Sequence, residues 1–198
     1  MDNSSGSSEE RRAPNGLYYR VIGRGAPLLL LHGLIASGVM FDLLADLLRD
    51  DFRLLIPDLR GHGKSRQMGG PYDVATMADD LGAAMVETGF GRGMVLGYSH
   101  GGAIAQALAR AKPEAVSQLL LACTYACNVA TLREYLEGIA TLGLLSIVTP
   151  LTLAKVIVQP DRAGAMPGMT AEKAAWLRGI MGANGRKEMR AAASATAE

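Results

Sequence analysis

The sequence predicts a single α/β domain in which helices cover both faces of a mostly parallel sheet. Short apolar runs alternate with segments of helical periodicity from residue 27 to residue 122, as expected of successive strand–helix units. The runs are continuously apolar, which is typical of strands buried on both faces of a parallel sheet. The chain has 198 residues, 49% of them hydrophobic, and this is enough for one domain with its own core.

The individual elements follow from these patterns in chain order. Buried strands are predicted over 27–31, 52–56, 94–96 and 116–122, after an early strand over 17–23. Helices are predicted over 41–48, 76–87 and 99–111. The third helix ends at Lys112-Pro113, because proline cannot continue a helix.

The two ends of the chain differ from this core, which we place at residues 16–127. Residues 1–15 are polar and lack the apolar stretch of a secretory signal, so we expect a disordered lead-in. Residues 128–198 contain helical patterns, including 151–158 and 171–181, and no strand-like run. We expect them to form a helical cap over the core.

Composition and charge exclude several classes of function. The net charge of +1 indicates no nucleic-acid partner. The most apolar stretch, 142–158, is broken by Pro150 and Lys155, so no membrane span is expected. Cys123 and Cys127 lack the spacing and companion ligands of a metal site, and we interpret them as free thiols of a cytoplasmic protein. No metal and no cofactor is predicted.

The strongest motif is Gly97-Tyr98-Ser99-His100-Gly101, between a predicted strand and a predicted helix. This is the setting of a nucleophile elbow, a turn so tight that only small residues fit at Gly97 and Gly101. Ser99 is then exposed at the carboxyl edge of the sheet. The backbone N–H of His100 lies at the helix N-terminus, where it would stabilise an oxyanion. The alternative is a serine in an ordinary strand–helix turn.

The loop Leu31-His32-Gly33-Leu34 follows the first buried strand. We expect Gly33 to let the backbone approach a substrate, and His32 to brace the loop with its ring rather than to act in catalysis.

The loop from Asp58 to Ser65 reads D-L-R-G-H-G-K-S and follows the next strand. Asp58 and Arg60 are placed to hold its glycine-rich turn by charge-assisted hydrogen bonds. A phosphate-binding loop is the rival interpretation, but the full G-x-x-x-x-G-K-[ST] pattern is absent.

Together these three motifs, in this order and spacing, resemble the serine-nucleophile α/β-hydrolases. The resemblance covers about 17–126 and implies the hydrolase sheet with flanking helices and a helical cap. It implies Ser99 as nucleophile, the amides of Leu34 and His100 as the oxyanion hole, and a small apolar ester-like substrate. A serine at this position argues against the relatives that use an aspartate nucleophile.

The pattern departs from the family after the elbow. The family's catalytic acid and histidine follow the nucleophile on further strands. The sequence has three histidines, His32, His62 and His100, and none lies beyond the neighbour of Ser99. We therefore expect the last strands to be missing, the edge strand 116–122 to be uncovered and open to self-association, and hydrolysis to be impaired.

Two functional hypotheses follow. The first is a serine hydrolase fragment that lacks the acid and histidine of its triad, since none of His32, His62 and His100 is expected to replace the base. The second is a non-catalytic protein that keeps the pocket and binds a small ligand or a partner. A weaker third idea is that a separate chain supplies the missing strands.

Overall fold

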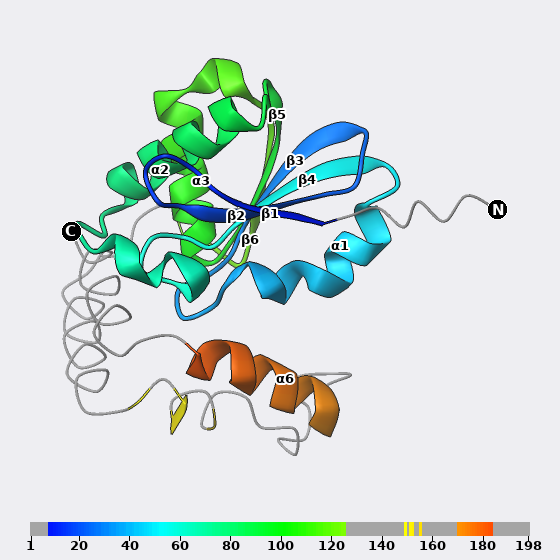
Figure 1. Ribbon diagram of the computed structural model, residues 1–198, viewed down its shortest axis with the longest axis vertical. Coiled ribbons are helices and arrows are strands. Elements are labelled where there is room, and N and C mark those ends of the chain that lie inside the picture. The colour runs from blue at the N-terminus through cyan, green and yellow to red at the C-terminus, as the bar shows by residue number, and fades with distance from the viewer. Residues whose placement is uncertain (1–7, 126–148, 150, 153–154, 156–169, 184–198) are drawn as a thin grey trace.

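A computed structural model describes residues 8–125, 149, 151, 152, 155 and 170–183. Its centre is one six-stranded sheet of order β1-β2-β4-β3-β5-β6 (Figure 1). The strands are β1 (Glu9–Arg12), β2 (Tyr18–Ile22), β3 (Ala26–Leu31), β4 (Phe52–Pro57), β5 (Gly93–Tyr98) and β6 (Val116–Ala122). β3 to β6 are parallel, whereas β2 is antiparallel to β4, and β1 is antiparallel to β2. The predicted α/β fold with a mostly parallel sheet is confirmed.

The helices lie where the sequence periodicity predicts them. They are α1 (Asp42–Leu48), α2 (Val74–Glu87), α3 (His100–Ala111) and α6 (Ala171–Gly182). Short 3₁₀ turns occupy Gly38–Phe41, Gly63–Met68 and Pro113–Ala115. The carboxylate of Asp73 caps α2 by accepting a hydrogen bond from the Thr76 backbone N–H, which begins the helix two residues earlier than predicted.

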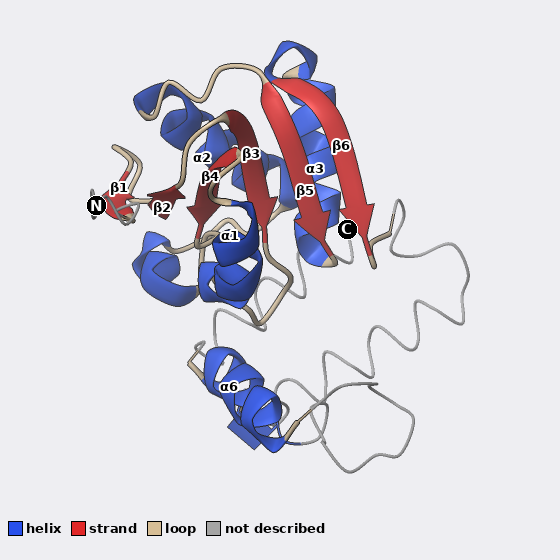
Figure 2. Ribbon diagram, turned by 90° about the vertical axis from the view of Figure 1, so that its right-hand side faces the viewer, coloured by secondary structure: helices blue, strands red, loops and turns tan. Residues whose placement is uncertain are grey.

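Helices cover both faces of the sheet, with α2 and α3 on one face and α1 on the other (Figure 2). Side chains along a strand alternate between the two faces. In β3, Leu29 and Leu31 belong to the cluster that includes α2 and α3, whereas Leu28 and Leu30 belong to the cluster that includes α1. Each leucine of this run is therefore buried against a helix, which explains why the strand reads as continuously apolar.

The expectation of a disordered stretch over 1–15 is wrong for residues 8–15. Glu9–Arg12 form β1, which pairs with β2 through four residues. All four side chains are exposed, so main-chain pairing rather than burial holds the strand. Ion pairing adds to it, because the Lys64 ammonium lies 2.7 Å from a Glu10 carboxylate oxygen. Hydrophobic patterning gives no sign of such a strand.

The expectation that 116–122 is a buried strand is half right. The strand forms as β6, but it lies at the edge of the described sheet, where its central residues are exposed. The edge position agrees with the expectation that this strand is uncovered.

The helix predicted over 171–181 is confirmed as α6, which lies near the carboxyl ends of the parallel strands (Figure 2). Ala174 and Met181 of α6 pack against Ile35, and the Arg66 guanidinium donates a hydrogen bond to the Ala183 carbonyl. Most of the rest of the predicted cap, including 128–148, 156–169 and 184–198, lies outside the described residues. Within the described part of the chain, no helix has the length and apolar character to cross a membrane.

Candidate active site

Ser99 lies at the junction between β5 and α3, in a backbone conformation with φ 52° and ψ −121°. Such a conformation costs a non-glycine residue about 1–3 kcal/mol and needs support from its surroundings. Hydrogen bonds provide that support: the Ser99 N–H donates to the Ala122 carbonyl of β6 at 2.9 Å, and the Gly102 N–H donates to the Ser99 carbonyl at 2.9 Å. The strand–turn–helix setting predicted for the motif is present.

Glycines around Ser99 are required by close backbone approaches. A Cβ on Gly97 would lie 2.5 Å from the Gly101 carbonyl oxygen, and a Cβ on Gly101 would lie 2.5 Å from the carbonyl oxygen of His32. A Cβ on Gly33 would come within 3.2 Å of the Ser99 Cβ. The loop after β3 therefore borders the serine directly, as the sequence motifs predict.

Two backbone amides next to Ser99 have no hydrogen-bond acceptor among the described residues. One belongs to Leu34, in the turn that the Ala36 N–H closes onto the Gly33 carbonyl at 3.3 Å. The other belongs to His100, the first residue of α3, whose N–H has no intrahelical acceptor. Their role as oxyanion donors stays a prediction.

The ring of His32 braces the loop after β3. Its Nε2 accepts a hydrogen bond from the Leu59 backbone N–H at 2.9 Å, so the proton is on Nδ1, which donates to the Gly33 carbonyl at 2.7 Å. The side chain is fully buried, and desolvation, followed by the nearby His62, holds its pKa well below the usual value. Both ring nitrogens are occupied, which matches the structural role expected from the sequence.

The other two histidines also point into the protein. The ring of His62 lies edge-on to His32 at 5.2 Å between centroids, with its Nδ1 2.9 Å from the Arg60 carbonyl oxygen. The Nδ1 of His100 lies 3.1 Å from the Tyr125 hydroxyl, and burial lowers the pKa of His100 to about 4. Within the described residues the Ser99 hydroxyl has no hydrogen-bond partner, so none of the three rings is placed as its base.

Asp58 holds the loops around the site through its buried carboxylate. One oxygen accepts from the Gly38 backbone N–H and the other from the Lys64 backbone N–H, both at 2.7 Å. The bond to Lys64 closes the glycine-rich turn as predicted, and the bond to Gly38 ties it to the loop after β3.

Arg60 forms a bidentate pair with Asp80 of α2, at 2.6 and 2.7 Å, and its third nitrogen donates to the Gly69 carbonyl at 3.1 Å. These bonds raise the pKa of Arg60, with the Asp80 hydrogen bond as the largest cause. The sequence does not indicate this role of Asp80, because its partner Arg60 lies in a loop 20 residues away along the chain.

A short strap of residues 122–125 also supports the turn at Ser99. The Thr124 hydroxyl donates to the Ser99 carbonyl at 2.7 Å, and the Gln106 amide donates to the Tyr125 carbonyl at 2.9 Å. No sequence motif indicates this strap, since its contacts depend on how β6 pairs with β5.

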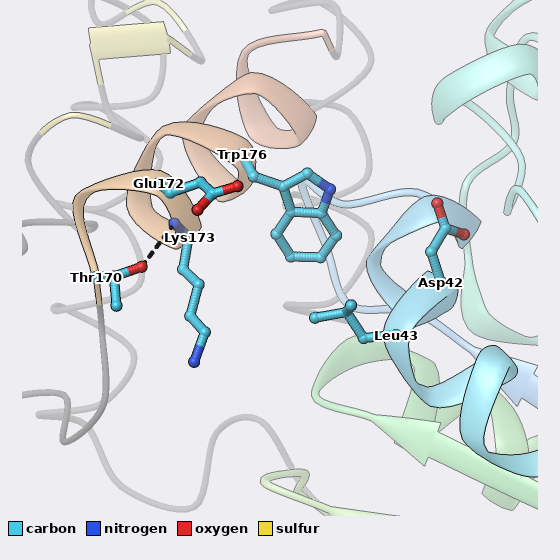
Figure 3. Close-up of a pocket in the computed structure, with 6 residues that line it drawn as sticks. All are labelled: Asp42, Leu43, Thr170, Glu172, Lys173 and Trp176. Carbon is cyan, nitrogen blue, oxygen red and sulfur yellow. Dashed lines mark hydrogen bonds between the residues drawn. The ribbon is translucent and has the colours of Figure 1, made fainter.

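A separate cavity of about 400 Å³ lies between α1 and α6 (Figure 3). It is lined by Asp42, Leu43, Thr170, Glu172, Lys173 and Trp176. Ser99 and the loops that border it are not among these residues. Within the described ranges, no group of three or more histidine, cysteine, aspartate or glutamate side chains is arranged to hold a metal ion.

Several known proteins that are similar to this chain in sequence are named as hydrolases. The chain is 36% identical over 107 residues to an AB hydrolase superfamily protein, YisY, of Bacillus subtilis, a match that covers 53% of this chain and 40% of that protein. It is 31% identical over 105 residues to a soluble epoxide hydrolase of a Corynebacterium, covering 53% and 37%. The matched region thus spans less than half the length of these relatives.

Solved structures show the same likeness over nearly all of the chain. A thermophilic esterase from Thermogutta terrifontis superposes with a TM-score of 0.81 at 25% identity, covering 97% of this chain and 72% of the esterase. An esterase from Exiguobacterium antarcticum gives 0.80 at 24% identity, covering 97% and 74%. A family profile described as the alpha/beta hydrolase fold matches residues 26–140. The chain therefore belongs to the α/β-hydrolase fold family.

Proposed function

We propose that Ser99 is the nucleophile of an acyl hydrolase that acts on a small, apolar, ester-like substrate. The observation that carries the proposal is the backbone of Ser99, held in a costly conformation at the turn from β5 into α3. Residues held in such conformations cluster at active sites, where the surrounding structure supports them. The Ser99 hydroxyl would attack the substrate carbonyl carbon, and the amides of Leu34 and His100 would donate to the oxyanion that forms.

In this proposal, none of the three histidines in the 198 residues acts as the base for the reaction. His32 uses both ring nitrogens on backbone groups, and His62 and His100 direct their Nδ1 atoms toward the Arg60 carbonyl and Tyr125. A serine hydroxyl without a base in hydrogen-bond reach is a weak nucleophile. In this proposal the chain alone hydrolyses its substrate slowly, through attack by the unassisted Ser99 hydroxyl beside the oxyanion donors.

Turnover of p-nitrophenyl acetate by the 198-residue chain tests both parts of the proposal. We expect slow hydrolysis that Ser99→Ala abolishes, since the substrate would meet the oxyanion donors without an activated nucleophile. Adding imidazole should accelerate the Ser99-dependent part of the rate, because a small diffusible base would replace the missing one. Ser117→Ala removes an exposed hydroxyl from β6 and should leave the rate unchanged.

The outcomes separate the two parts. Equal rates for the parent and Ser99→Ala, with and without imidazole, would remove the nucleophile assignment. Fast Ser99-dependent turnover without imidazole would keep the nucleophile and show that a group within the chain serves as its base.

A second candidate function is that of a non-catalytic ligand-binding protein. The buried, fully bonded state of His32 favours it, as does the lack of a hydrogen bond between the Ser99 hydroxyl and any of the three rings within the described residues. This function predicts saturable binding of an ester without its hydrolysis, in both the parent chain and Ser99→Ala.

A further inference from the structure

The cavity between α1 and α6 has the size of a small-molecule site. Its volume of about 400 Å³ lies within the range of ligand-binding pockets. α6 is held in place beside it by apolar contacts of Ala174 and Met181 with Ile35 and by the hydrogen bond from Arg66 to Ala183. Side chains from the two helices therefore line a half-open space, and Ser99 is not among the residues that line it.

One side of this cavity is apolar. Trp176 of α6 is 40% exposed and Leu43 of α1 is 63% exposed, which is high for large apolar side chains. The indole is turned toward Leu43 across the cavity (Figure 3). Exposed apolar side chains that face each other over a hollow are typical of a binding site rather than of a solvated surface.

Carboxylates stand on both sides of the indole. Asp42 comes from α1 and Glu172 from the first turn of α6 (Figure 3). The Asp42 carboxylate forms an ion pair with the Arg20 guanidinium, with 2.7 Å between the nitrogen and the oxygen. The Glu172 carboxylate has no ion-pair partner among the described residues. The Lys173 ammonium points away from the indole (Figure 3). A tryptophan face flanked by carboxylates attracts a cation more strongly than a neutral or anionic group.

We propose that this cavity binds a small organic cation, an ammonium group carrying apolar substituents, with the charge between Glu172 and the Trp176 indole and the substituents against Leu43. A neutral apolar molecule of the same shape would gain the contacts with Trp176 and Leu43 but not the attraction of the indole face and the carboxylates. The site is independent of the nucleophile, so Ser99→Ala should bind the cation as the parent chain does.

Fluorescence provides a local readout, because Trp176 is the single tryptophan of the chain. We would titrate the full chain with choline, and in parallel with 3,3-dimethylbutan-1-ol, the neutral molecule of the same shape, at constant ionic strength. Choline should change the Trp176 emission saturably and bind about fivefold more tightly than the alcohol. Equal affinities, or no saturable change with choline, would overturn the proposal.

Charge variants test the assignment of residues. Glu172→Gln keeps the size of the side chain and the fluorescent reporter, and should weaken choline binding about threefold. Glu114→Gln removes the same charge from the exposed turn Pro113–Ala115 and should bind as the parent does. Trp176→Leu removes the fluorescent reporter, so choline binding by this variant would be measured by saturation-transfer NMR of the choline methyl groups. We expect this binding to be lost. If Glu172→Gln and Glu114→Gln bind choline equally, the carboxylate role is wrong.

Discussion

Two leucine runs in the same sheet have opposite environments. In β3, the exposed fractions of Leu28, Leu29, Leu30 and Leu31 are 5%, 0%, 0% and 0%. In β6, those of Leu119, Leu120 and Leu121 are 37%, 43% and 46%. The two runs are in register through β5, since Leu30 pairs with Leu96 and Leu96 pairs with Leu120. Leu30 and Leu120 therefore point to the same face of one sheet.

The difference comes from the number of neighbours, not from the residues. β3 has β4 and β5 on its two sides and helices over both faces, whereas β6 pairs with β5 alone among the described strands. A continuous apolar run thus indicates a strand, but its burial is set by what the rest of the fold places around it.

The largest expected effect separates these two runs directly. Leu30→Ala should lower the free energy of unfolding by about 2–5 kcal/mol, because it opens a cavity among fully buried side chains. Leu120→Ala removes the same atoms from the same face and should cost less than about 1 kcal/mol, since the site is solvated. Urea denaturation measures both. Equal losses would mean that β6 is as well covered as β3.

A second comparison sets a crowded glycine against an open one. Gly101→Ala should destabilise the protein by about 2 kcal/mol or more, since its Cβ would meet the carbonyl groups of Leu31 and His32 at the end of β3. Gly179→Ala in α6 has nothing within 4 Å and should stabilise it by about 0.5–1 kcal/mol, because alanine is the better helix former. If Gly101→Ala unfolds at the same temperature as the parent or at a higher one, the close approach of Gly101 to the end of β3 is wrong.

Acid should lower the free energy of unfolding through protonation of His100. Its pKa of about 4 in the folded state lies below the ordinary value of 6.5, so the unfolded chain binds the proton more readily. The stability it contributes is complete above about pH 6.5 and is lost as the pH falls toward 4, with about 2 kcal/mol gone at pH 5. Urea midpoints at pH 7 and pH 5 should differ less in His100→Gln than in the parent, and an unchanged difference would exclude His100 as a cause.

The smallest expected effect concerns self-association of the chain through β6, the edge strand of the described sheet. Exposed apolar strand edges pair with other chains, so we predict that the chain self-associates through β6. Leu120→Lys should reduce the apparent mass measured by light scattering, whereas Leu47→Lys changes an even more exposed leucine on α1 and should not. Loss of association in both variants would point to general solubility rather than to β6.

Much of this structure could be predicted from local patterns. The positions of β3 to β5, of α2 and α3, and of the turn at Ser99 follow from apolar runs, helical periodicity and glycine spacing, which are properties of adjacent residues. β1 was missed, because its four polar residues are held by main-chain pairing and by the bond of Lys64 to Glu10. The pairing of Arg60 with Asp80 and the strap at Thr124 join residues far apart in the chain, so no local pattern reveals them.

The central claim is that Ser99 is a nucleophile at the elbow, and trapping an acyl group on it tests the claim most directly. After incubation with p-nitrophenyl acetate in the absence of imidazole, trypsin releases the segment 93–110, in which Ser99 is the single serine. We predict one acetyl group on Ser99 by fragment-ion mass spectrometry, because in the proposed function no base in hydrogen-bond reach assists deacylation. An unmodified Ser99, with acetyl groups on Tyr98 or on surface lysines instead, would contradict the account.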